Sequence, residues 1–324
     1  MVTLNDIREA QARLRGVAVR TELIETSLGE YAAGPDGRKL YLKPENLQPI
    51  GAFKLRGAYN KIASLSPEDR SRGVITYSSG NHGQGVAYAA RALGTKAVVV
   101  MPDNTPAIKR DAVASLGAEI VVVGPGSLER QAKAEELAER HGYVIVPPFN
   151  DEKIIAGQGT MGLEILEDLP EVETVLMPVG GGGMLSGVAT AIKLSKRSAK
   201  VIGVEPDLAA DAQASLRAGK IVESTAEQAT RTIADGLRTQ SLGRITFEHI
   251  QRYVDDIVTV SEDEIRQATR WLATNPKTVA EPSGAVAVAG FLFHREQLPR
   301  TTMNVAIISG GNVDPRLLEE IRQG

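Results

Sequence analysis

The chain has 324 residues, 42% apolar and 24% charged, a composition typical of a soluble globular protein with either two lobes or one large α/β domain. Its net charge of −3, with Lys and Arg spread along the sequence, lacks the basic excess expected for binding to nucleic acid or to an anionic membrane. Because the chain has no cysteine, disulfides, thiolate nucleophiles and iron–sulfur clusters are excluded within it.

The N-terminal segment predicts no secretion signal. Asp6 and Glu9 come early, and no long apolar run accompanies them. The longest uncharged run, 174–192, contains Pro178 and four adjacent glycines, which a helix exposed to lipid would tolerate poorly. We therefore expect a cytoplasmic protein with no membrane segment.

Short β-branched runs alternate along the chain with amphipathic helical stretches. Repeated strand–helix units predict a parallel sheet with helices on both faces. Loop-like composition interrupts the pattern at 147–153 and again at 219–244. In chain order, strands are expected at 74–77, 97–100, 120–123, 144–146, 175–177, 201–204 and 305–308, and helices at 85–93, 106–116, 128–141, 184–194 and 262–274.

Lys54 lies among small and apolar neighbours in the run 51–58, at the expected start of a helix. A desolvated lysine loses its proton more easily, and a neutral amine can form a Schiff base with an aldehyde. A lone lysine is more often a solvated surface charge. On this segment alone, the catalytic and the structural interpretations stay balanced.

The four glycines 180–183 lie between a predicted strand and a predicted helix. Glycine allows positive φ and a close approach of the backbone to a ligand. The N-terminus of the following helix adds partial positive charge, so the run favours a phosphate site over a simple flexible turn.

A second glycine run, 157–162, matches the dinucleotide pattern G-x-G-x-x-G. The preceding residues 152–156 make a poor strand, which argues against a nicotinamide cofactor. We expect this run to mark the N-terminus of a helix instead.

Two polar turns follow predicted strands. Ser309 follows 305–308, at the carboxyl end of a strand, where α/β proteins place ligands, although a serine in a glycine turn is an equally good interpretation. The turn after 74–77 has exposed N–H groups that suit an anion such as a substrate carboxylate, or a serine that caps a helix beginning near Gly83. This second turn comprises Ser78, Ser79, Gly80, Asn81 and His82.

Together these motifs resemble the fold-type II pyridoxal-phosphate enzymes, specifically the threonine/serine dehydratase and serine racemase family. The resemblance runs from 43–48 to 309–312. It implies an α/β fold similar to the tryptophan synthase β subunit, with two open, twisted parallel-sheet domains and pyridoxal 5'-phosphate in the cleft between them. The implied large domain comprises 1–72 and 152–324, and the implied small, substrate-gating domain comprises 73–151.

The resemblance also implies roles for individual residues. Lys54 matches the lysine that forms the Schiff base and moves the Cα proton, and Ser79 matches an acid/base on the opposite face. The turn 78–82 would hold the substrate carboxylate. Around the cofactor, Phe53 would lie against the ring, Asn81 at the 3-oxygen, Gly180, Gly181, Gly182, Gly183 and the Met184 N–H around the phosphate, Gly236 near the ring, and Ser309 facing the pyridine nitrogen.

The family further suggests a divalent-cation site and a homodimer. Glu205, the Ala209 carbonyl and Asp211 resemble its metal loop, and oxygen ligands suit Mg²⁺, Ca²⁺ or Mn²⁺. A strand–helix connection with solvated acids is an equally good interpretation of these residues.

The implied function is that of an L-threonine/L-serine ammonia-lyase acting on a small amino acid and giving a 2-oxo acid and ammonia. Alternatives are a serine racemase, a 3-hydroxyaspartate ammonia-lyase or a non-catalytic amino-acid sensor. Leu128 stands where mammalian-type serine racemases have an arginine, and 238–241 differs in length from their double-serine run. We expect no appended regulatory domain, and in this the chain resembles the short catabolic dehydratases.

Overall fold

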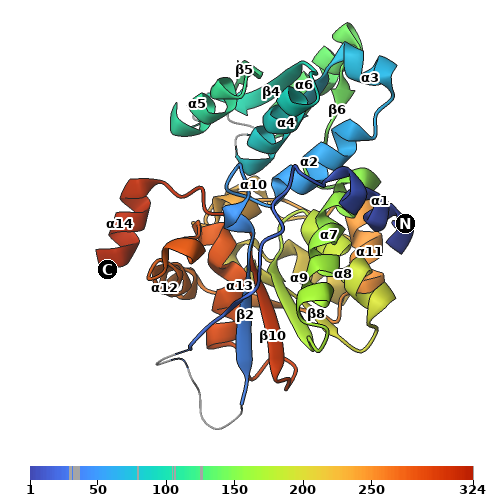
Figure 1. Ribbon diagram of the computed structural model, residues 1–324. Coiled ribbons are helices and arrows are strands. Elements are labelled where there is room, and N and C mark those ends of the chain that lie inside the picture. The colour runs from blue at the N-terminus through green and yellow to red at the C-terminus, as the bar shows by residue number, and fades with distance from the viewer. Residues whose placement is uncertain are drawn as a thin grey trace.

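The computed structural model describes residues 1–28, 31, 37–78, 80–103, 105, 107–124 and 127–323, without the side chains of residues 108, 127 and 128. Figure 1 shows two lobes, with the smaller one above the larger. Each lobe is built on its own sheet.

The large lobe contains a six-stranded sheet in the order β1-β2-β10-β7-β8-β9. All neighbouring strands are parallel except β1 and β2. The last strand in the sequence, β10, therefore lies inside the sheet, between β2 and β7. The strands are β1 (Ile24–Glu25), β2 (Lys39–Pro44), β7 (Thr174–Pro178), β8 (Lys200–Pro206), β9 (Asp256–Val260) and β10 (Met303–Ile308).

The small lobe contains a fully parallel four-stranded sheet in the order β5-β4-β3-β6. Its strands are β3 (Val74–Tyr77), β4 (Ala97–Pro102), β5 (Glu119–Val123) and β6 (Val144–Ile145). All of them fall within 73–151, but the exact domain boundaries stay a prediction.

Helices cover the sheets and join the lobes. In the small lobe they are α4 (Asn81–Ala92), α5 (Ala107–Ser115) and α6 (Ser127–His141). The remaining helices are α1 (Leu4–Arg13), α2 (Lys54–Ala63), α3 (Pro67–Arg72), α7 (Glu152–Asp168), α8 (Gly183–Ser195), α9 (Asp211–Ala218), α10 (Ala226–Ala229), α11 (Arg244–Tyr253), α12 (Glu262–Leu272), α13 (Pro282–Phe293) and α14 (Pro315–Gln323).

The large sheet is buried on both faces because successive side chains of a strand point to opposite sides. On β7, Val175 and Met177 pack into the core under α8 and α11, whereas Leu176 packs with α12 and α13. Apolar side chains on both faces are what a parallel sheet covered by helices requires. The carboxyl ends of the central strands are thereby fixed at one edge of the lobe.

The predicted α/β fold class, with two parallel-sheet units, is confirmed, and each predicted strand has a counterpart. Strands β1, β2 and β9 and helices α1, α3, α10, α11 and α13 were not predicted. Helix α13 is apolar on all sides and almost wholly buried, so it lacks the one-sided pattern that identifies a surface helix.

The interpretation of the glycine run 157–162 as a helix N-terminus is wrong. Helix α7 begins at Glu152, and the run lies inside it, fully buried. A Cβ on Gly157 would lie 2.6 Å from the Arg56 carbonyl oxygen, and one on Gly159 would lie 2.9 Å from the Gly187 carbonyl oxygen. The glycines therefore allow α7 to pack closely against α2 and α8.

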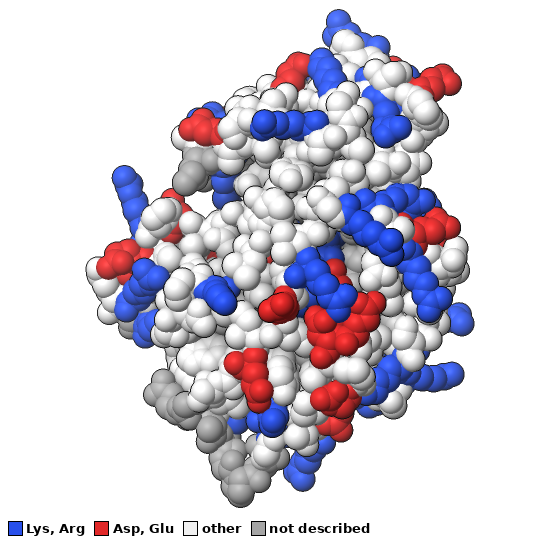
Figure 2. All heavy atoms as spheres, in the orientation of Figure 1, with Lys and Arg blue, Asp and Glu red and all other residues white. Residues whose placement is uncertain are grey.

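Charged side chains of both signs are interspersed over the face in Figure 2, which has no continuous basic surface. Among the described residues, no helix combines the length and apolarity needed to cross a membrane.

Candidate active site

Lys54 is the first residue of α2 and faces the junction of the lobes. Its Nζ donates a hydrogen bond to the Pro148 carbonyl oxygen at 2.8 Å. Burial lowers the pKa of the Lys54 amine to about 8, because the charged form loses hydration. Helix α4 comes close to this point, since a Cβ on Gly85 would lie 3.2 Å from the Lys54 carbonyl. A substantial fraction of Lys54 is thus a neutral amine near physiological pH.

Asn81 begins α4 and links the lobes through both ends of its amide. Its Nδ2 donates to Glu281 Oε1 at 2.6 Å, and its Oδ1 accepts from Asn312 Nδ2 at 2.7 Å. The pKa of Glu281 is raised to about 7, mainly by burial and to a smaller extent by the nearby Asp235 charge. The second hydrogen of the Asn81 amide remains available for an oxygen in the cleft.

The turn after β3 surrounds the start of α4. His82 is buried, and its Nε2 lies 3.0 Å from the Val146 carbonyl oxygen, which makes Nε2 the protonated nitrogen. Burial and the Lys54 charge lower the pKa of His82 to about 3, so the ring is neutral. Gly80 N–H donates to Ser78 Oγ at 3.3 Å. Ser79 and the side chain of Leu128 lie outside the described residues.

The four glycines 180–183 follow β7 and lead directly into α8. Gly182 has φ +88°, a left-handed conformation that favours glycine. A Cβ on Gly181 would lie 2.3 Å from the Phe149 ring, and one on Gly183 would lie 2.9 Å from Phe149 Cβ. Gly181 and Gly183 therefore pack closely against Phe149, and the turn leads into the N-terminus of a 13-residue helix, a place where backbone N–H groups suit a phosphate.

Ser309 directly follows β10 and lies beside α13. It is almost fully buried, and its Oγ donates to the Ser283 carbonyl oxygen at 3.5 Å. Ser283 Oγ in turn accepts from Gly236 N–H at 2.8 Å. A Cβ on Gly180 would lie 3.6 Å from the Gly236 carbonyl oxygen. These contacts place Ser309, Gly236 and the glycine turn side by side.

Backbone contacts join the Lys54 segment to the same place. Phe53 N–H donates to the Ser309 carbonyl oxygen at 3.0 Å, and Ala52 forms a β-bridge with Gly310. Lys54 Nζ lies 5.2 Å from the centre of the Phe53 ring. The structure thus brings together Lys54, Asn81, Gly236, Ser309 and the four glycines, although these motifs are far apart in the sequence.

A buried ionic cluster fixes the helix that carries Lys54. Arg56 is 1% exposed and bonds Glu45 on one side and Glu164 on the other, at 2.8 and 2.6 Å. Lys43 Nζ also contacts Glu164, at 2.6 Å. Each buried charge has a partner, which removes most of the cost of its desolvation. The cluster ties α2 to β2 and α7.

Glu205 and Asp211 form a second group at the carboxyl end of β8. Glu205 accepts backbone N–H bonds from Ala212 and Gln213 at 3.1 and 2.8 Å. Both carboxylate oxygens of Asp211 are buried without a hydrogen-bond partner. The pKa of Glu205 is raised well above its usual range, mainly by burial and also by the Asp211 charge. Burial raises the pKa of Asp211 to about 7. Of the two buried carboxylates, Asp211 is the one that lacks a partner, and an oxygen donor of this kind fits a divalent cation.

Several site residues were missed from the sequence. Glu281, Ser283, Pro148 and Phe149 lie in segments whose composition resembles ordinary loops or an apolar helix. Asn312 belongs to a glycine-rich motif that was recognised, but its bond to Asn81 depends on tertiary contacts alone. The only available signal was the Pro147–Pro148 break, which predicts an irregular backbone without specifying where its carbonyls point.

Comparisons with known proteins agree with this geometry. Residues 17–310 match the family model described as "Pyridoxal-phosphate dependent enzyme". The chain is 47% identical to an L-threonine ammonia-lyase of Thermotoga maritima, over 99% of this chain and 78% of that protein. It is 40% identical to an L-threo-3-hydroxyaspartate ammonia-lyase of Saccharomyces cerevisiae, over 96% and 94% of the two chains.

A solved structure shows the same arrangement in three dimensions. Serine racemase from Dictyostelium discoideum superposes with a TM-score of 0.89 and 38% identity, over 97% of this chain and 99% of that one. The fold, the lysine at the junction of the lobes and the family match agree. The chain belongs to the family of pyridoxal-phosphate dependent enzymes.

Proposed function

We propose that this protein is an L-threonine/L-serine ammonia-lyase that uses pyridoxal phosphate and yields a 2-oxo acid and ammonia. The observation that carries the proposal is the placement of Lys54, an amine with a lowered pKa, beside the turns that end β3, β7 and β10. The Thermotoga relative named above supports threonine as a substrate.

The residues of the site fit the cofactor. The turn 180–183 offers N–H groups at a helix N-terminus to the phosphate, and Asn81 offers an amide hydrogen to the 3-oxygen. Ser309 offers a hydroxyl rather than a carboxylate to the pyridine nitrogen, so no fixed negative charge there holds that nitrogen protonated. When bound, pyridoxal phosphate supplies the electron sink that stabilises negative charge at the substrate Cα.

Lys54 acts as the base. The Pro148 carbonyl accepts one hydrogen of the Nζ and thereby orients its lone pair. The neutral Nζ takes the proton from Cα, and the electron pair left by that bond forms the Cα–Cβ double bond as the β-oxygen departs. The departing hydroxyl takes up one proton, equivalent to the one that Nζ removed from Cα, and leaves as water, which returns Lys54 to the neutral amine. The released enamine then hydrolyses to the 2-oxo acid and ammonia.

The substrate carboxylate is held by the turn 78–82, where the α4 N-terminus supplies N–H groups and partial positive charge. His82 stays neutral and fixes the turn through the Val146 carbonyl. We assign Ser79 as the acid/base on the opposite face, as the resemblance to the family implies.

Two other activities use the same constellation. A serine racemase needs a proton donor on the face opposite Lys54, and the Dictyostelium racemase structure favours this alternative. A 3-hydroxyaspartate ammonia-lyase needs room and charge for a second carboxylate, and the yeast relative favours that one. Chiral analysis of L-serine incubations separates racemisation from elimination, and D-serine forming faster than pyruvate would overturn our assignment.

We also propose that Glu205, the Ala209 carbonyl and Asp211 bind Mg²⁺, with Ca²⁺ or Mn²⁺ as substitutes. The support is the buried, partnerless Asp211 carboxylate beside Glu205. Among the described residues, no three acidic or histidine side chains meet at one point, so waters and the carbonyl must complete the coordination.

A cytoplasmic homodimer remains our proposal for the assembled protein. Sedimentation equilibrium on the purified chain tests the dimer, and cell fractionation tests the location. The proposal includes no partner beyond the amino-acid substrate.

The decisive experiment is turnover by purified protein incubated with pyridoxal phosphate. We expect a visible absorbance band, release of 2-oxobutyrate from L-threonine and of pyruvate from L-serine, and loss of both in Lys54→Ala. A band without turnover of any 3-hydroxy amino acid would favour a non-catalytic amino-acid sensor. A protein that stays colourless would overturn the proposal.

A further inference from the structure

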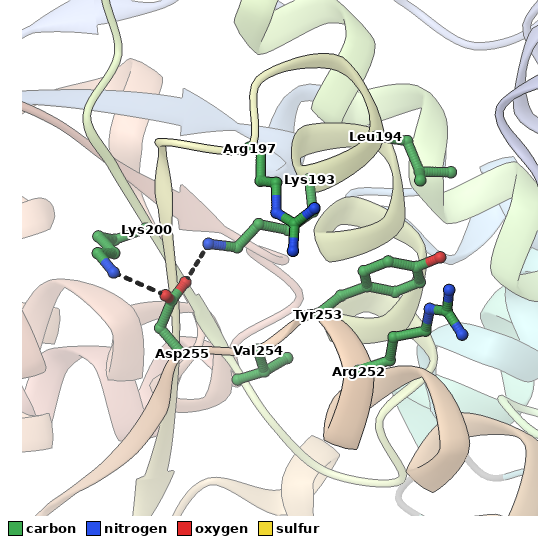
Figure 3. Close-up of a pocket in the computed structure, with 8 residues that line it drawn as sticks. All are labelled: Lys193, Leu194, Arg197, Lys200, Arg252, Tyr253, Val254 and Asp255. Carbon is green, nitrogen blue, oxygen red and sulfur yellow. Dashed lines mark hydrogen bonds and ion pairs between the residues drawn. The ribbon is translucent and has the colours of Figure 1, made fainter.

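A cavity of about 560 Å³ lies at the end of the large lobe opposite the candidate active site. Lys200 begins β8 and Asp256 begins β9, so the cavity lies at the amino ends of these strands. The active-site turns lie at the carboxyl ends. Figure 3 shows the lining residues: Lys193, Leu194, Arg197, Lys200, Arg252, Tyr253, Val254 and Asp255.

The lining carries an excess of three positive charges, because four cations face one carboxylate. Asp255 pairs with Lys193 at 2.5 Å and with Lys200 at 3.0 Å, as the dashed lines in Figure 3 show. Asp255 also accepts the Val201 N–H at 2.9 Å. The single carboxylate is therefore occupied by the two lysines.

The two arginines of the cavity are available. Within the part of the chain that the structure describes, neither Arg197 nor Arg252 forms an ion pair, and both are exposed. A guanidinium group presents two parallel N–H donors, which match two oxygens of a phosphate or carboxylate. Because both groups are already hydrated, a ligand meets them without first breaking an internal salt bridge.

The cavity also has an apolar wall. Leu194 is 45% exposed, an unusual position for a large aliphatic side chain near the end of a helix. The Tyr253 ring lies beside it in the lining, with the Arg252 guanidinium 5.6 Å from the ring centre. An anion with a flat or short apolar portion would cover this wall.

Stabilisation of helix ends explains only part of the positive charge. Helices α8 and α11 end at the cavity, and cations at helix C-termini offset the partial negative charge there. Lys193 already does so for α8, because it lies in the last turn of that helix. Arg252 lies in the last turn of α11 and does the same there, so Arg197, just beyond the end of α8, is the cation in excess of this need.

We propose that this cavity binds a small organic phosphate with at least two negative charges. Arg197 and Arg252 hold the phosphoryl oxygens, Lys200 adds positive charge, and the apolar portion lies against Tyr253 and Leu194. The volume falls within the usual range of small-molecule sites, roughly 300–1,000 Å³.

Isothermal titration of the cofactor-loaded enzyme with phenyl phosphate, pyrophosphate and citrate tests the proposal. The visible absorbance of the enzyme is followed in parallel to show that the active site stays filled. We expect one phenyl phosphate per chain, with an affinity that falls as salt rises. The double variant Arg197→Ala/Arg252→Ala should lose at least about tenfold in affinity, since two charge-assisted contacts disappear.

Matched variants separate this site from general charge attraction. Arg8→Ala/Arg15→Ala removes two exposed arginines on or just after α1 and should leave the affinity unchanged. Tyr253→Ala should weaken phenyl phosphate more than pyrophosphate. Asp255→Asn releases both lysines and should strengthen binding of all phosphates severalfold. Citrate binding better than both phosphates would overturn the phosphate assignment.

Two further results would overturn the site itself. One is that none of the three anions binds when its concentration is raised to on the order of 10 mM, because binding weaker than that would not be specific. The other is that the double variant of the cavity arginines and the control double variant lose the same amount of affinity for the anions. If the cavity arginines only stabilise the helix ends, the double variant would melt earlier and yet show no change in anion binding.

Discussion

Asn81 and Glu281 face each other across the junction of the two lobes, with Asn81 Nδ2 2.6 Å from Glu281 Oε1. One residue begins the first helix after β3, and the other immediately precedes α13 in the large lobe. Lys109 of α5 and Asp235 form an ion pair between the same two lobes. The orientation of the Asn81 amide therefore depends on a carboxyl group whose protonation changes near neutral pH.

The raised pKa of Glu281 predicts a pH-dependent stability. The pKa of Glu281 lies at about 7 in the folded protein, above its usual value of 4.5. Below pH 4.5 the carboxyl is protonated in both the folded and the unfolded state and does not affect stability, but as the pH rises from 4.5 to 7 it progressively lowers the free energy of unfolding. Glu281→Gln removes this ionisation. In the cofactor-free protein, the free energy of unfolding of the variant relative to the parent should therefore increase by on the order of 3 kcal/mol across that window.

Urea unfolding at several pH values measures this difference. Glu223→Gln, an exposed glutamate on the surface, is the control and should show no such trend. A difference between Glu281→Gln and the parent that stays constant from pH 4.5 to 7 would contradict the expected ionisation.

The lowered pKa of Lys54 predicts how fast the cofactor attaches. Only the neutral amine attacks an aldehyde, so the rate of attachment to cofactor-free protein should rise with pH with a midpoint near 8 and level off roughly one pH unit higher. Stopped-flow absorbance after mixing with pyridoxal phosphate records this rate. A midpoint near 10.5, the ordinary value for lysine, would show that the amine is not desolvated.

The Glu205–Asp211 pair predicts a stabilisation by Mg²⁺ that depends on pH. Protons must leave these carboxyls before a cation binds, and the pKa of Asp211 is raised to about 7. Millimolar Mg²⁺ should therefore raise the melting temperature more at pH 8 than at pH 6. Asp211→Asn should abolish the effect, whereas Asp207→Asn, an exposed acid in the same loop, should preserve it. An identical Mg²⁺ response in both variants would place the cation elsewhere.

Ser309→Asp should depress elimination. A carboxylate at this position would favour a protonated pyridine and would face the Ser283 carbonyl oxygen in a nearly fully buried place. We expect a loss of roughly tenfold or more in kcat for L-threonine, because the protein group at the ring nitrogen tunes the electron sink. Ser309→Ala keeps the site neutral and should lose less. Equal kcat for the parent and Ser309→Asp would rule out this role.

Gly157→Ala should destabilise the protein through a single methyl group. Its Cβ would lie 2.6 Å from the Arg56 carbonyl oxygen and 2.7 Å from Gly57 Cα, both of them backbone atoms that cannot rotate away. Overpacking of this kind costs about 1–3 kcal/mol. Because α2 carries Lys54, we expect turnover to fall together with the free energy of unfolding. Unchanged stability would show that α7 moves freely relative to α2.

Most of the fold could be predicted because its signals are local. The buried strands of both sheets are continuous β-branched runs. The residues next to Val99 and Val175 in the sequence are therefore enough to predict a strand at each position. Lys54, Asn81, Ser309 and the four glycines stand at the ends of such elements, where ligands are expected in α/β folds. Their approach to one another was inferred from the resemblance to a family.

What could not be predicted depends on contacts between distant segments. Nothing local distinguishes Glu281 from a surface glutamate, since its burial arises from contacts with Asn81 and Gly310, which are distant in the sequence. The buried charges of Arg56 and Lys43 are likewise ordinary in the sequence. The run 157–162 was misread because glycine serves equally for ligand approach and for helix packing.

The position of β10 bears on the biosynthesis of the protein. This strand lies between β2 and β7, and Ser309 and Asn312 follow it directly. Until residues 303–312 have emerged from the ribosome, the central sheet lacks an inner strand and β2 has no parallel neighbour. From the translation of β7 until that of β10, the nascent chain thus exposes the facing edges of β2 and β7, and the site that includes Ser309 cannot be complete before this segment has been translated.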